Sequence, residues 1–125
     1  MPIVAPSKAP APQPVTVRAP ADARRLEMVW DDGCESAYRH LHLRAFCPCA
    51  RCQGHQGPIG WQEAADALPV AALALRDIEE VGGYALRLVW GDGHATGIYT
   101  FAYLRALAPL ADMEEVAVRE LTFGR

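Results

Sequence analysis

Several large classes of protein are excluded by what this 125-residue sequence lacks. No run approaches the roughly 18 apolar residues of a membrane-spanning helix. The N-terminus lacks the charged, apolar and small-residue regions of a secretory signal peptide. Basic residues are not in excess either, since 12 Lys and Arg stand against 15 Asp and Glu for a net charge of −3. A protein that neutralises nucleic-acid phosphates would show a basic face. We therefore expect a cytoplasmic protein that binds neither membranes nor nucleic acid.

The usual catalytic motifs are also missing. The sequence contains no G-x-S-x-G, no P-loop and no paired-carboxylate arrangement. Residues 91–97, GDGHATG, superficially resemble a dinucleotide-binding loop, but the third glycine comes one residue late and a hairpin explains the string better. The sequence therefore offers no catalytic residue and no residue for an organic cofactor, and we do not expect an enzyme.

The proline content is confined mainly to one end of the chain. Six of the 10 prolines lie in the first twenty residues, and this segment has no apolar periodicity. Closely spaced prolines favour an extended polyproline conformation. We therefore assign residues 1–20 to a Pro/Ala-rich arm without a core of its own, either disordered or packed on the domain or a partner. Residues 21–125 form the single domain.

This domain contains an internal repeat. The segment from Leu26 to Cys34, LEMVWDDGC, matches LRLVWGDGH sixty positions later, and the tripeptide Leu-Arg-Ala recurs at residues 43–45 and 104–106. In each copy, alternating apolar residues predict a strand, Asp-Gly predicts a tight hairpin turn, and a second strand runs to a tyrosine. A helix follows at residues 39–46 and 101–107. The predicted unit is strand, turn, strand and short helix, used twice.

Outside the two copies the pattern is weaker. Residues 61–67 predict a short helix, and residues 70–80, which follow Pro69, predict a strand. Residues 113–123 fit either a strand or a helix. The predicted fold class is α+β, mainly antiparallel β-sheet with short helices.

Three of the four cysteines lie within six residues, as Cys47, Cys49 and Cys52. Thiolates at this spacing repel one another unless they are protonated, oxidised or bound to a cation, and a tetrahedral Zn²⁺ accepts Cys₃His ligation readily. Three alternatives remain: a redox pair of Cys49 and Cys52, a disulfide that leaves one thiol over, and unliganded surface cysteines. Spacing alone favours the metal.

The repeat sharpens this interpretation. The second copy has Ala108-Pro109-Leu110 where the first has Cys47-Pro48-Cys49, so the repeated unit does not need cysteines at this place. His94 directly follows the turn of the second copy, from which its imidazole could complete a site. A plain hairpin histidine is the alternative, and His55, three residues after Cys52, is a second candidate for the fourth ligand.

The strings LRAFCPCARC (residues 43–52) and VGGYALRLVWGDGHATGIY (residues 81–99) resemble the gamma-butyrobetaine hydroxylase-like N-terminal domain family, also called the domain-of-unknown-function 971 family. The resemblance covers about residues 22–110. It implies one zinc ion held by Cys47, Cys49, Cys52 and His94. It also implies that the zinc is structural, since related proteins can lack the cysteines. Family members fused to ATPases of iron–sulfur cluster assembly suggest iron or an iron–sulfur cluster as the alternative cofactor.

The hydroxylase's own chemistry needs a barrel with a His-x-Asp/Glu iron motif, which no histidine of this sequence opens. We therefore expect a non-catalytic, zinc-stapled module that associates with a protein partner or with itself. The surface for this would be a sheet face, the Pro-rich arm, or the aromatic residues Tyr99, Phe101 and Tyr103, for which core packing is the alternative. The second hypothesis is an accessory protein of iron–sulfur or iron metabolism.

Cys34 stands at the repeat position of His94. If the two copies are related by a pseudo-twofold axis, Cys34 faces residues 108–110 and lies away from the metal. We expect it to be a free, partly buried thiol.

Overall fold

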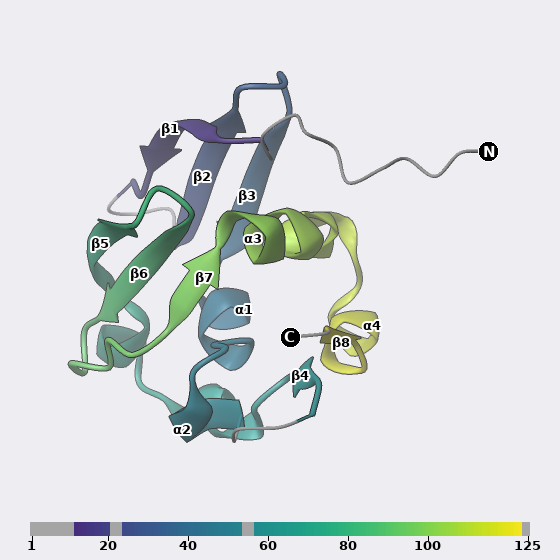
Figure 1. The fold of residues 1–125 in the computed structure, drawn as a ribbon. Helices are drawn as coiled ribbons and strands as arrows, with labels where there is room; N and C mark the ends of the chain where they lie inside the picture. The colour runs from purple at the N-terminus through teal and green to yellow at the C-terminus, as the bar shows by residue number, and fades with distance from the viewer. Residues whose placement is uncertain (1–11, 21–23, 54–56, 124–125) are drawn as a thin grey trace.

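The computed structural model describes residues 12–20, 24–53 and 57–123. The fold is built on two three-stranded antiparallel sheets, with strand orders β1-β2-β3 and β5-β6-β7, and a two-stranded ladder joins β4 to β8 (Figure 1). The predicted α+β class, mainly antiparallel with short helices, is confirmed. The first sheet contains β1 (Pro14–Arg18), β2 (Arg25–Trp30) and β3 (Glu35–Arg39), and the second contains β5 (Leu75–Val81), β6 (Ala85–Trp90) and β7 (Ile98–Thr100).

The two sheets are copies of one unit, and the unit is larger than the sequence indicated. Besides the two predicted hairpin strands, each copy has a preceding strand that pairs with the first hairpin strand. In both sheets the register of that pairing shifts at the same place, opposite the last two residues of β2 and of β6. The backbone bond from Asp31 to the carbonyl of Gln13 also recurs, as the bond from Gly91 to the carbonyl of Ala74. The repeated unit is therefore three strands and a helix.

Strand β1 lies inside the segment that the sequence assigned to the arm. Its residues pair in register with β2, for example Val17 with Met28 and Arg18 with Glu27. This part of the arm thus packs on the domain as an edge strand, where proline is tolerated because an outward N–H needs no partner. The rest of the arm, residues 1–11, lies outside the described residues.

Each sheet is followed by the predicted helix, α1 (His40–Ala45) in the first copy and α3 (Phe101–Leu107) in the second. The side chain of Thr100 accepts a hydrogen bond from the N–H of Tyr103 and so caps α3. Short elements continue each copy: α2 (Ala50–Gln53) after α1, and the 3-10 helix η3 (Ala108–Asp112) after α3.

The segments outside the repeat differ in part from expectation. The helix predicted at residues 61–67 is the 3-10 helix η1 (Glu63–Ala67). The strand predicted from residue 70 begins at Leu75 instead, because residues 70–73 form the 3-10 helix η2 (Val70–Leu73) after Pro69. The undecided C-terminal segment contains both structures, helix α4 (Glu115–Arg119) and strand β8 (Thr122–Phe123), which pairs with β4 (Ile59–Gly60).

The two copies exchange contacts across the core. The hydroxyl of Tyr38 donates to the carbonyl of Leu104 on α3, and the hydroxyl of Tyr99 donates to the carbonyl of Leu43 on α1. The tryptophans at the ends of β2 and β6 also contact the helix of the other copy. Trp30 packs edge-on against Phe101 and Trp90 against His40. Because each sheet lies on the other copy's helix, the core is shared between the copies.

Tyr99 and Phe101 are almost fully buried in this core, with exposed fractions of 0% and 2%. They are therefore not the association surface that the sequence offered as one alternative, while Tyr103 is partly exposed. No helix in the described part of the chain is long and apolar enough to cross a membrane.

Candidate metal centre

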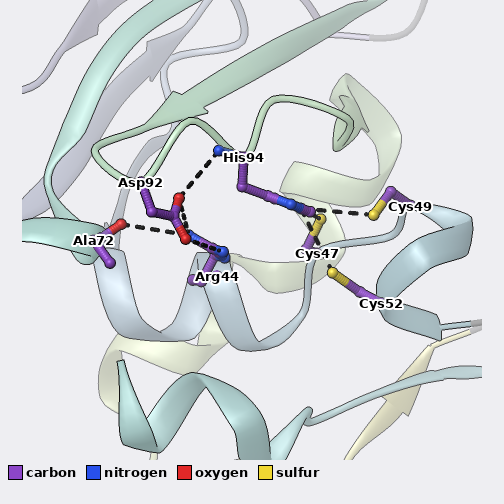
Figure 2. Close-up of polar contacts among 7 residues, drawn as sticks. All are labelled: Arg44, Cys47, Cys49, Cys52, Ala72, Asp92 and His94. Atoms are coloured by element: carbon purple, nitrogen blue, oxygen red, sulfur yellow. Dashed lines mark hydrogen bonds and ion pairs between the residues drawn. The ribbon is translucent and has the colours of Figure 1, made fainter. Parts of the chain in front are cut away.

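Three cysteines and one histidine meet where the two copies join (Figure 2). Cys47 and Cys49 lie in the loop that leaves α1, and Cys52 lies on α2. His94 comes from the far side, directly after the turn that follows β6. Their candidate ligand atoms all lie within 4.8 Å of one another. The four residues proposed from the sequence are thus brought together and could hold a metal ion.

The turn that carries His94 is defined by its backbone bonds. Gly93 has φ of +89° and donates its N–H to the carbonyl of Trp90, and the N–H of Trp90 donates to the carbonyl of His94. The positive φ explains why glycine occupies this place. The N–H of His94 also donates to a carboxylate oxygen of Asp92 at 3.1 Å. The backbone of His94 is therefore held on both sides.

The distances at the centre fit a single tetrahedral ion. Nε2 of His94 lies 3.4 Å from Sγ of Cys47, 3.6 Å from Cys49 and 3.5 Å from Cys52. Ordinary bond lengths of about 2.3 Å to sulfur and about 2.0 Å to nitrogen give a sulfur-to-nitrogen edge of about 3.5 Å in a tetrahedral zinc complex. Hydrogen bonding does not account for the arrangement, because one ring nitrogen carries at most one proton and cannot donate to three sulfurs.

The protein shifts the pKa values of the three thiols in different directions. Burial raises the pKa of Cys47 far above its usual range and also raises that of Cys52. Burial acts on Cys49 too, but hydrogen bonds from the Thr96 side chain and the Cys52 backbone outweigh it and lower the pKa of Cys49. The protein alone therefore does not favour three thiolates, and a cation would supply the charge that lets all three ionise.

The surroundings of His94 favour the neutral form of its imidazole. Burial lowers the pKa of His94, and the positive charge of Arg44 lowers it further, against the opposite effect of Asp92. A neutral ring is the form that binds a metal.

An ion pair ties the two ligand segments together. Arg44, on α1 three residues before Cys47, makes two hydrogen bonds to the carboxylate of Asp92, at 2.8 and 3.1 Å (Figure 2). A third bond runs from Arg44 to the carbonyl of Ala72 at 3.4 Å. The guanidinium hydrogen bond holds the pKa of Asp92 at about 2. Asp92 thus fixes both the His94 turn and the helix that leads into the cysteines.

Backbone approach at the centre requires a glycine. A Cβ atom on Gly97 would lie 2.7 Å from Sγ of Cys47 and 3.0 Å from the ring of Tyr99.

Thr96 matches Ser36 of the first copy but has a different hydrogen-bond partner. Ser36 accepts from the Trp30 indole, whereas Thr96 hydrogen-bonds to Cys49. Thr96 and Gly97 are therefore positions at which the second copy contacts the cysteines.

The other cysteine and histidines lie elsewhere. His55 lies outside the described residues. His40 and His42 are buried on α1, where each packs edge-on against a tryptophan.

Cys34 is free, but the expectation that it is partly buried is wrong, because the structure exposes it. Its Sγ lies 3.5 Å from the Arg105 guanidinium. Residue Leu110, at the repeat position of Cys49, is buried in the core.

The family model described as "Gamma-butyrobetaine hydroxylase-like, N-terminal" matches residues 17–105. The chain belongs to this family. A search of curated proteins gave no match.

Solved structures that are similar to this chain include a member of the DUF971 family. A protein of unknown function of the DUF971 family from Acidithiobacillus ferrooxidans ATCC 23270 is 33% identical, with a TM-score of 0.56 over 77% of this chain and 92% of that one. Two proteins with NMR solution structures are 27% and 28% identical. Their TM-scores are 0.62 and 0.57, over 84% and 81% of this chain and 75% and 76% of theirs.

Sequence reasoning did not identify Arg44, Asp92 and Thr96 as neighbours of the centre. A signal for the first two was present, since Arg44 and Asp92 both recur in the other copy, as Arg105 and Asp32. The structure shows that these recurring residues form an ion pair in each copy, since Arg105 pairs with Asp32 as Arg44 pairs with Asp92.

Proposed function

We propose that this domain is a non-catalytic module in which one zinc ion, held by Cys47, Cys49, Cys52 and His94, joins the two copies of the repeat, and that it associates with another protein. The observation that carries the zinc site is the nearly equal separation of Nε2 from three sulfurs, which fits one tetrahedral ion.

The donor set supports a structural ion. Three thiolates and an imidazole form a ligand set that zinc prefers, and four protein ligands leave no open position for a substrate. When bound, the ion would neutralise the thiolates and join the α1–α2 segment to the β6–β7 turn. A structural zinc contributes on the order of 10 kcal/mol of apparent binding free energy, which is comparable to the whole stability of a small domain.

The size of the centre favours one ion over an iron–sulfur cluster. A cluster places two or more iron atoms between its cysteines and so separates their sulfurs further than a single ion does. Here all four ligand atoms lie within 4.8 Å of one another. This observation supports a single ion over an iron–sulfur cluster at these cysteines.

Metal analysis of the purified protein tests the site. We expect one colourless zinc per chain, and loss of that zinc in Cys49→Ser. The matched control is Cys34→Ser, which removes a cysteine from the repeat position of His94 and should keep the metal. Equal loss in both variants, or a brown protein that contains iron, would contradict the proposal. Cobalt added to the apo-protein should give the absorption of a tetrahedral thiolate complex.

A further inference from the structure

The second strand of each hairpin begins differently in the two copies. In the first sheet, β3 pairs with β2 from Glu35 onward, directly after the turn. In the second sheet, β7 begins only at Ile98, which is its first residue paired with β6. The turns themselves are alike, because the N–H groups of Trp30 and Trp90 each donate to the carbonyl four positions later. Residues 95–97 of the second copy therefore lie outside the sheet.

One extra residue in the second copy accounts for this difference. Ser36 stands two positions before Tyr38, whereas its match Thr96 stands three positions before Tyr99. The two tyrosines occupy equivalent places, because each pairs with the second residue of the preceding strand, β2 or β6. The additional residue is therefore accommodated before β7, as in a β-bulge, and it shifts Thr96 away from the place that Ser36 occupies in the first sheet.

The shift leaves an indole of the second copy without its hydrogen bond. In the first copy, the indole N–H of Trp30 donates to the hydroxyl of Ser36 at 2.9 Å. In the second copy, the side chain of Trp90 is fully buried, and its indole N–H has no hydrogen-bond partner among the described residues. A buried donor without a partner destabilises a fold. The second copy therefore keeps an arrangement that is unfavourable for its own core.

The same shift brings two residues against the cysteines. The backbone of Gly97 approaches Cys47 so closely that a Cβ atom would lie 2.7 Å from Sγ. The side chain of Thr96 hydrogen-bonds to Cys49. Because a thiolate has no proton to give, the hydroxyl of Thr96 is the donor when Cys49 is ionised. The segment outside the sheet thus contacts two of the candidate ligands without supplying a ligand itself.

We propose that Thr96 is a positioning residue of the metal centre, whose hydroxyl donates to the sulfur of Cys49 and fixes that ligand for the ion. Hydrogen bonds from outside the ligand set orient metal ligands and adjust their charge. The first copy supports the assignment, because it lacks the extra residue and has Leu110 at the position of Cys49, and there Ser36 stays on the indole. The inference rests on the proposed zinc site and deepens it by naming a residue that controls it.

Two variants of Thr96 test this role. Thr96 is exposed, so its replacement leaves the core unchanged. Thr96→Val removes the hydroxyl at similar volume and should weaken zinc binding roughly tenfold in chelator competition. In the cobalt-loaded protein, the sulfur-to-metal charge-transfer band of Thr96→Val should move to lower energy, because the lost hydrogen bond no longer stabilises the electrons of the sulfur. Thr96→Ser keeps the hydroxyl and should match the wild type in both measurements.

The matched control is Ser36→Ala in the first copy. It removes a hydroxyl that bonds to Trp30 and Tyr38, so it should lower the free energy of unfolding but leave the position of the cobalt band unchanged. The band is measured in the metal-bound protein, so a loss of stability alone does not move it.

Three results would overturn the proposal: a Thr96→Val protein with unchanged affinity and band, an equal change in Thr96→Ser, or the same band shift in Ser36→Ala. The zinc content of the wild type separates this inference from the proposed function. If zinc is stoichiometric and Thr96→Val behaves as the wild type, the role of Thr96 fails and the metal centre stands. If the wild type binds no zinc, both fail.

Discussion

Replacing Asp92 by alanine should destabilise the folded protein by about 2 kcal/mol. The ion pair with Arg44 lowers the pKa of Asp92 from 3.8 to about 2, and each pH unit of such a shift corresponds to about 1.4 kcal/mol. The Asp92 side chain is 31% exposed, so solvent screening reduces the full figure. The Arg44 side chain is only 10% exposed, and without Asp92 its charge would keep only weak partners among the described residues, the carbonyl of Ala72 and the ring of Trp90.

The repeat supplies the control. Asp32 also accepts two hydrogen bonds from an arginine, Arg105, and one from the N–H two residues later, as Asp92 does. Both bonds from Arg105 come from Nη1, whereas Arg44 uses both terminal nitrogens, and the Arg105 side chain is 30% exposed. Asp32→Ala therefore removes a weaker and more exposed ion pair and should have a smaller effect on the free energy of unfolding.

Urea unfolding followed by tryptophan fluorescence measures both variants. Excess zinc keeps the metal bound, so that a loss of zinc does not enter the comparison. Arg44→Met in the Asp92→Ala background should recover part of the loss, because it removes the unpaired buried charge. If Asp32→Ala is as harmful as Asp92→Ala, or if Arg44→Met makes the single variant worse, burial of the guanidinium is not what makes this pair matter.

Further predictions concern the centre and the buried histidines. Gly97→Ala should lower zinc affinity at least tenfold by displacing Sγ of Cys47, measured by chelator competition; an unchanged affinity would contradict the close approach. Chelation of zinc should lower the melting temperature of the wild type but not of Cys49→Ser. Burial lowers the pKa of His42, so the unfolded state binds more protons and stability should fall as pH drops below about 6.5. His42→Phe should reduce that fall in acid unfolding curves; an equal fall would refute it.

The sequence predicted those parts of the fold that carry strong local signals. Both hairpins follow from alternating apolar residues that end in Asp-Gly turns, and α3 was predicted with its observed bounds. Strand β1 was missed because its proline and its place in a Pro-rich segment indicate an arm. What makes it a strand is pairing with β2, which is a tertiary effect that composition does not carry.

The four candidate ligands were predicted from the crowded thiols, the repeat and the family resemblance, and the resemblance is what favoured His94 as the fourth ligand. Thiols crowd at residues 47–52, and His94 replaces Cys34 at a turn. The residues that position the ligands were missed because they act across the copies. Arg44 is 48 positions from Asp92, and nothing local relates them. The exposure of Cys34 could not be predicted either, since the burial of a turn residue depends on tertiary packing and not on the local pattern.

The exchange of contacts between the copies has a consequence for how the chain is made. During synthesis the first copy emerges with Tyr38, Arg44 and three cysteines, while their partners in the second copy, Leu104, Asp92 and His94, come 42 or more positions later. A nascent chain that stops short of His94 presents three thiols without their fourth ligand. Tight metal binding should therefore be among the last events of folding, and a loaded centre would mark a finished domain.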